Sequence, residues 1–177
     1  ILRYPNKELS LDKYYDGAMR GEIWGYTTAG IAQTQEEMDN HLQNNRPNWG
    51  TGWGAGDIMY KNLVDRYDDK GEVIDKGVVN SGNNTLKDHG DLRVIGNNTP
   101  RYNFGLMLDA QWKGLDFSIF FQGVMKRDYW LSGPYFWGAD GGMWQSCAFK
   151  EHLDYWSPDN RDAYYPKAYF ENGGKNK

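Results

Sequence analysis

The sequence predicts an all-β fold with one long antiparallel hairpin, long loops around it and short helices within those loops. Residues 102–112 and 115–124 alternate apolar and polar side chains, which is the period of a β-strand. Only Lys113 and Gly114 separate the two runs, and a short glycine-containing connection between such runs indicates a hairpin. Each run matches the ~9–11 residues of a tilted strand that crosses a bilayer, whereas a typical globular strand has only ~5–6.

The two sides of this hairpin are expected to differ in polarity. One side carries Phe104, Leu106, Leu108, Phe117, Ile119 and Phe121, and the other carries Asn103, Asp109, Gln111, Asp116, Ser118 and Gln122. Both aspartates fall on the polar side, as expected if the apolar side meets lipid, where a charge is costly. Tyr102 and Trp112 stand at opposite ends of the apolar side, in the positions of two aromatic girdles.

Composition narrows the class of protein. Only 39% of the 177 residues are hydrophobic and 16% are aromatic, and an apolar content so rich in aromatics suits membrane girdles, sugar platforms or protein contacts. A net charge of -4 without a basic cluster argues against nucleic acid as a partner. The single Cys147 excludes an intrachain disulfide and a cysteine-based metal site, and the three histidines have no metal-ligand spacing.

We expect loops with short regular pieces on both sides of the hairpin. Before it, Thr34 with Glu37 three residues later forms a capping-box pattern over a helix of about two turns that buries Met38 and Leu42. After it, residues 146–156 have a helical pattern, with an N-cap and one shared face formed by Ser146, Phe149, Leu153 and Trp156.

Four segments, taken in order, resemble a known family. They read GEIWGYTTAGIAQTQEEMD, GDIMYKNL, VIGNNTPRYNFGLMLDAQWKGLDFSIFFQGVMKRDYW and YWSPDNRDAYYPKAYF. Together they are similar to the C-terminal part of SusC/RagA-type TonB-linked outer-membrane transporters of Bacteroidetes. The series covers most of the chain, and the segment from Val94 to Trp130 is its most specific part.

The resemblance implies a large antiparallel transmembrane β-barrel, of 22 strands in that family, with an N-terminal plug. This chain is then expected to be a fragment: residues 1–99 form extracellular loop and strand pieces, residues 100–125 the transmembrane hairpin, and residues 126–177 an extracellular loop region. The turn at Lys113 and Gly114 is expected on the periplasmic side, because such barrels have short periplasmic turns. The opening ILRYPNKELS has no signal-peptide pattern, so a signal was removed or the chain is partial.

The family implies a function as well as a fold. Its members import oligosaccharides or peptides across the bacterial outer membrane, powered through TonB, and work with a SusD-like surface lipoprotein. The expected partners are therefore that lipoprotein, TonB acting through the plug, outer-membrane lipid and a glycan or peptide substrate.

A calcium site is one candidate that the resemblance raises. Many members carry an Asp-Leu-Asn-Gly-Asp-Gly run after the GDIxYK segment, and the same place here reads NLVDRYDDKGEVID. Calcium binds several closely spaced oxygens beside a turn-forming glycine. The candidate ligands are Asn62, Asp65, Asp68, Asp69 and Asp75, beside Gly71. Asparagine replaces the first aspartate and the spacing is broken, so a plain acidic loop is the other interpretation.

The tryptophans of the last segment are the second candidate site. They are Trp130, Trp137, Trp144 and Trp156. They can pack inside a large loop, contact a partner or stack on a ligand, and aromatic side chains suit all three roles. No nucleophile elbow or recognisable carboxylate pair indicates an enzyme. The rival interpretation is a secreted carbohydrate-binding β-sandwich, which regular strands at 8–12-residue spacing would favour.

Overall fold

The computed structural model describes residues 1–68, 70–132, 149–169 and 175–176. In this part of the chain the fold is all-β, with strands paired into small two-stranded sheets and little helix. The strands are β1 Glu22–Gly25, β2 Thr28–Ile31, β3 Arg46–Pro47, β4 Ile58–Tyr60, β5 Arg66–Tyr67, β6 Val73–Asp75, β7 Val78–Val79, β8 Arg93–Asn97, β9 Tyr102–Trp112 and β10 Leu115–Met125. The helices are α1 Gln35–Leu42 and the short 3-10 helix η2 Lys150–Leu153.

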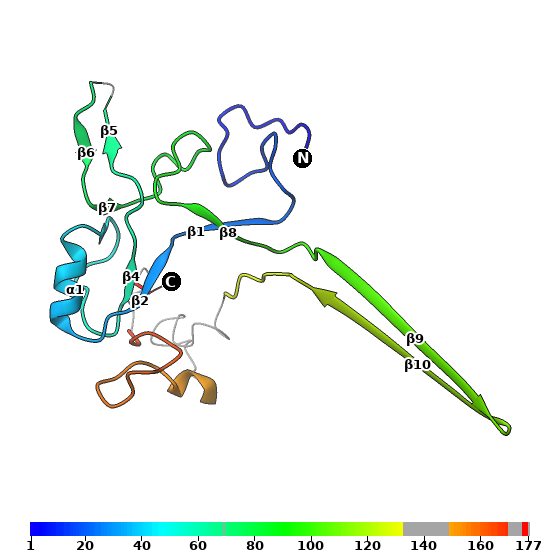
Figure 1. Cartoon of the computed structure of the whole chain (residues 1–177). Helices are drawn as coiled ribbons and strands as arrows, with labels where there is room; N and C mark the ends of the chain where they lie inside the picture. The colour runs from blue at the N-terminus through cyan, green and yellow to red at the C-terminus, as the bar shows by residue number, and fades with distance from the viewer. Residues whose placement is uncertain (69, 133–148, 170–174, 177) are drawn as a thin grey trace.

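The sheets divide the molecule into a head and an arm (Figure 1). In the head, β1 pairs with β8, β2 with β4 and β5 with β6, all antiparallel, while β3 and β7 form a short parallel pair. The arm is the hairpin β9–β10, which projects far from the head (Figure 1). Among the described helices, none has the length and apolar character needed to span a membrane.

The predicted hairpin is confirmed. Strands β9 and β10 pair antiparallel over eleven residues each, from Trp112 opposite Leu115 at the turn to Tyr102 opposite Met125 at the base. Lys113 and Gly114 have φ of 47° and 86°. Two consecutive positive-φ residues are the signature of a type I′ turn, whose twist matches that of the strands it joins.

The predicted helix in the head is confirmed as α1. Thr34 is its N-cap, and its hydroxyl accepts a 3.1 Å hydrogen bond from the Glu37 amide. The Glu37 carboxylate reaches back to the Gln33 amide at 2.7 Å, one residue before the N–H that a capping box uses. Met38 is completely buried and Leu42 packs at the edge of the core, as the pattern predicts.

The core of the head is small and aromatic. Its buried side chains come from α1, the sheets and the loop before β4: Ala32, Met38, Trp53, Met59, Tyr60 and Val79. Beside them Tyr26 and Trp49 stack with ring centroids 4.6 Å apart, and the Tyr60 ring meets Trp49 edge-on at 5.3 Å. Such pairs add to the stabilisation that comes from burying apolar area.

The helix expected over residues 146–156 is the main correction. Within the described residues only the four-residue η2 forms, and Ser146, the predicted N-cap, lies outside them. Leu153 is 68% exposed while Trp156 is only 6% exposed, so the two side chains do not share a buried face. Trp156 follows the helix as part of an extended segment whose amide binds the Tyr165 carbonyl at 2.8 Å. Aromatic spacing in a loop imitated the periodicity of a helix.

Candidate functional site

The arm carries a continuous apolar face. Residues that are opposite one another in the register share a face, so the apolar row of β9 coincides with that of β10. Leu106 is opposite Phe121, and Leu108 is opposite Ile119. All residues of this face are exposed in the chain except Ile119 and Gly123, which are half-buried. The face is Tyr102, Phe104, Leu106, Leu108, Ala110, Trp112, Leu115, Phe117, Ile119, Phe121, Gly123 and Met125.

The dimensions of the arm suit a bilayer. An eleven-residue strand is roughly 36 Å long at ~3.3 Å per residue, and a tilt of ~40–45° reduces its span to roughly 25–28 Å. The apolar band of outer-membrane barrels is ~25 Å tall. Aromatic rings stand at both ends, with Tyr102 at the base and Trp112 at the turn, where the Lys113 ammonium lies 4.9 Å from the Trp112 ring centroid.

The opposite face of the arm is mostly polar, with three apolar side chains, those of Met107, Phe120 and Val124. It carries the predicted polar residues Asn103, Asp109, Gln111, Asp116, Ser118 and Gln122. In its centre Met107 lies opposite Phe120, and both side chains are more than half exposed. The Phe120 ring lies over Gly105. A Cβ added to Gly105 would come within 3.2 Å of the Cε2 atom of Phe120. A side chain at position 105 would therefore require the ring to shift by a few tenths of an ångström.

The acidic loop proposed for calcium folds as the small hairpin β5–β6 instead of a cluster of ligands. Asp65 accepts hydrogen bonds from the Gly77 amide and from the Asn62 side chain, both at 2.8 Å, and these contacts lower the pKa of its carboxyl group. Asp68 caps the turn by accepting from the amides of Lys70 and Glu72.

Two more of the carboxylates proposed as calcium ligands are Asp69 and Asp75. Asp75 pairs with Arg66 at 3.3 Å, and Asp69 lies outside the described residues. In the part of the chain that the structure describes, no three acidic, histidine or cysteine side chains are grouped so that they could hold a metal ion. Asp65, Asp68 and Asp75 thus bind donors of the protein itself, and the calcium site stays a prediction.

The predicted tryptophan contacts fall in different environments. Trp156 is buried, donates its indole N–H to Gln33 at 3.1 Å and packs tightly against Gly56, so it supports the loop and presents no free ring. Trp130 is half exposed beside Gly25 at the base of the arm. Trp137 and Trp144 lie outside the described residues. Of the two described rings, Trp130 alone is open to a partner.

A buried charge network in the head had no prediction from the sequence. The Lys175 ammonium lies 2.9 Å from the Asp57 carboxylate, with the two side chains only 1% and 0% exposed. Asp57 also accepts from the Gly54 amide, the Tyr169 hydroxyl and the Asn176 side chain. The pKa of Tyr169 is raised to about 12, mainly by burial and secondly by the hydrogen bond to Asp57. The network ties the end of the described chain to the loop before β4.

Comparisons with models of known protein families, with curated proteins and with solved structures gave no match for this chain.

Proposed function

We propose that this chain forms part of the wall of an outer-membrane transporter barrel of the SusC/RagA type, with β9–β10 crossing the bilayer. The observation that carries the proposal is the register of the arm, which joins two apolar rows into one exposed face of bilayer height. The polar face then lines a water-filled lumen. The head lies on the extracellular side, at the end of the arm opposite to the short turn (Figure 1).

The open edges of the arm support the same proposal. Strand β9 pairs with β10 and, within the described residues, with no other strand, so one edge of each strand has unpaired backbone groups. In hydrocarbon each unpaired N–H or C=O costs several kcal/mol by order of magnitude, so neighbouring strands must complete the sheet. A closed antiparallel barrel supplies these strands and leaves no edge.

The proposed activity is the active import of oligosaccharides or peptides, powered through TonB and assisted by a SusD-like lipoprotein on the cell surface. It is supported by the four family-like segments and by the exposed polar face of the arm, whose amide, hydroxyl and carboxylate groups suit a passage for polar solutes. We propose no catalytic role for the chain.

A secreted carbohydrate-binding β-sandwich is less well supported. A sandwich buries the inner faces of two sheets against each other. The described strands form separate two-stranded sheets, and the apolar side chains of the longest one are exposed instead of packed against another sheet.

A spin-label scan of the arm tests the proposal. Cys147 is the one cysteine of this chain, so serine at position 147, and at any cysteine elsewhere in the full-length protein, gives a background for single labels. The labels go at Leu106 and Ile119 on the apolar face and at Gln111 and Ser118 on the polar face. In the full-length protein reconstituted in lipid, the first two labels should be accessible to dissolved oxygen and the last two to a water-soluble nickel complex. Equal accessibility at all four positions would rule out the membrane-spanning arrangement.

Uptake by cells tests the activity itself. A strain lacking the gene should fail to accumulate at least one fluorescent oligosaccharide or peptide that the parent strain imports. Dissipating the proton-motive force should abolish import in the parent, because TonB depends on it. Unchanged uptake of every tested compound in the deletion strain would contradict the transport function while leaving the barrel assignment standing.

A further inference from the structure

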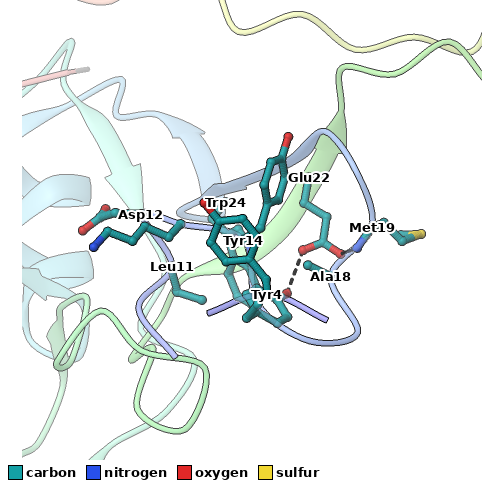
Figure 2. A pocket seen from close by; sticks show the side chains of 10 residues that line it. Tyr4, Leu11, Asp12, Tyr14, Ala18, Met19, Glu22 and Trp24 are labelled. Atoms are coloured by element: carbon teal, nitrogen blue, oxygen red, sulfur yellow. Dashed lines mark hydrogen bonds between the residues drawn. The ribbon is translucent and has the colours of Figure 1, made fainter. Parts of the chain in front are cut away.

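The first residues of the chain enclose a pocket that no part of the proposed transport function uses. It lies between the N-terminal loop and β1, and its volume is about 330 Å³ (Figure 2). Its walls include the aromatic rings of Tyr4, Tyr14, Tyr15 and Trp24 and the carboxylates of Asp12 and Glu22. Small-molecule sites begin at about this size and combine apolar walls with a few polar groups.

Hydrogen bonds hold the carboxylates of the pocket in place. Glu22 accepts from the Tyr15 hydroxyl at 2.7 Å and from the Met19 amide at 2.6 Å, and Figure 2 shows the dashed line that reaches Glu22. Asp12 accepts from the Asn84 side chain at 2.9 Å. A carboxylate has about four lone-pair directions, so both groups keep the capacity to accept from a ligand.

The aromatic walls are also ordered. Tyr15 is 8% exposed, and burial together with its bond to Glu22 raises the pKa of its hydroxyl to about 12, so it stays a neutral donor. Tyr4 and Tyr14 meet edge to face with ring centroids 5.8 Å apart, and both rings are partly open to solvent. A ligand therefore meets fixed aromatic surfaces beside fixed negative charge.

We propose that this pocket binds a small organic cation, a primary or quaternary ammonium group on a short apolar body. Aromatic faces attract such cations through the ring quadrupole, and the carboxylates add an opposite charge. The charged residues of the lining are Asp12 and Glu22, which are negative, and Lys13, which is positive, so the balance of charge favours a cation over an anion. Lys13 makes no ion pair with any described residue and is exposed, so its long side chain can turn away from an incoming cation.

Calorimetric titration of the full-length protein in detergent tests this site with matched probes. Choline is the cation, 3,3-dimethyl-1-butanol is its neutral isostere, and glucose tests the alternative of a sugar site. Choline should bind at least tenfold more tightly than the neutral isostere, while glucose should show no binding heat. Equal binding of the two isosteres, binding of glucose alone, or no heat with choline would each overturn the proposal.

Substitutions inside and outside the pocket test whether choline binds there. Tyr14→Ala removes an exposed ring of the pocket and Asp12→Asn removes a charge, and each should weaken choline binding roughly tenfold. Tyr164→Ala removes an exposed ring remote from the pocket and should leave binding unchanged. A near-ultraviolet circular dichroism spectrum like that of the parent shows that each variant is folded. Equal loss in the Tyr14 and Tyr164 variants would place the binding outside this pocket.

Discussion

Removing the positive charge of Lys175 is expected to lower the stability of the head around Asp57 by several kcal/mol. Lys175→Met keeps most of the side-chain volume but leaves the Asp57 carboxylate buried without its cation. Breaking a buried ion pair from one side costs about 3–5 kcal/mol. Asp57 keeps three neutral donors, from Gly54, Tyr169 and Asn176, so the loss should lie near the lower end, about 3 kcal/mol.

Amide hydrogen exchange measures this loss where it occurs. The Gly54 amide binds the Asp57 carboxylate, and the Ile58 amide binds the Asn176 side chain at 2.8 Å, so both report on the network. A loss of about 3 kcal/mol should speed their exchange roughly a hundredfold, since each 1.4 kcal/mol corresponds to a factor of ten. Adding Asp57→Asn to Lys175→Met removes the second charge and should recover part of the protection.

The matched control is Arg66 in β5, whose two ion pairs are partly exposed. Arg66 contacts Asp75 at 3.3 Å and Asp88 at 2.9 Å, with side chains about a third exposed. Arg66→Met should therefore cost less than ~1 kcal/mol and leave the Gly54 and Ile58 amides unaffected. The reasoning fails if Lys175→Met changes exchange at Gly54 and Ile58 by less than about threefold, or by no more than Arg66→Met does.

Two further predictions concern the membrane face and alkaline pH. In the full-length protein, Leu106→Arg and Ile119→Arg should each lower the yield of protein in the outer membrane, because a charge near the bilayer midplane costs roughly 2–4 kcal/mol. Gln111→Arg, on the polar face, should be tolerated. Equal yields of the three variants in immunoblots would contradict the assigned faces. Burial raises the pKa of Tyr60 and Tyr169 to about 12, so their contribution to stability is present below pH ~10 and is lost as the pH rises from ~10 to ~12. Tyrosinate absorbance should show this late titration in the folded protein, and ionisation of all tyrosines near pH ~10 would refute it.

The elements that could be predicted from the sequence are those whose signals are local. The arm follows from a two-residue alternation and a glycine turn, and α1 follows from Thr34 and Glu37 three residues apart. Each pattern lies within one continuous stretch of chain, Tyr102–Met125 for the arm and Thr34–Leu42 for α1, so distant parts of the chain do not need to be known. The register confirms the expected faces for the same reason, since a slip by one residue would exchange them.

The parts that could not be predicted depend on contacts between distant residues. The Asn176 side chain binds Asp57, 119 positions away in the sequence, and no sequence pattern around either residue predicts this contact. For Trp156 the sequence left three roles open, among them packing inside a loop. It gave no sign that Gly56 would pack against the ring or that Gln33, 123 positions away, would bind it. The pocket also escaped prediction, because three of its four rings come from an irregular loop without periodicity. Asn6 organises this loop by donating to the carbonyls of Ser10 and Tyr14.

The base of the arm shows where the proposed bilayer ends. The apolar face stops at the pair Tyr102 and Met125, and the next residues on the two strands, Arg101 and Lys126, are charged. Beyond them the Asp128 carboxylate accepts from the Asn97 amide at 2.8 Å, which fastens the returning strand to β8 in the head. Cations that follow an aromatic ring suit the headgroup layer, where a charge costs ~0–1 kcal/mol compared with ~2–4 at the midplane. The turn repeats the pattern with Trp112 and Lys113, so the same order of apolar face, aromatic ring and cation occurs at both surfaces of the proposed bilayer.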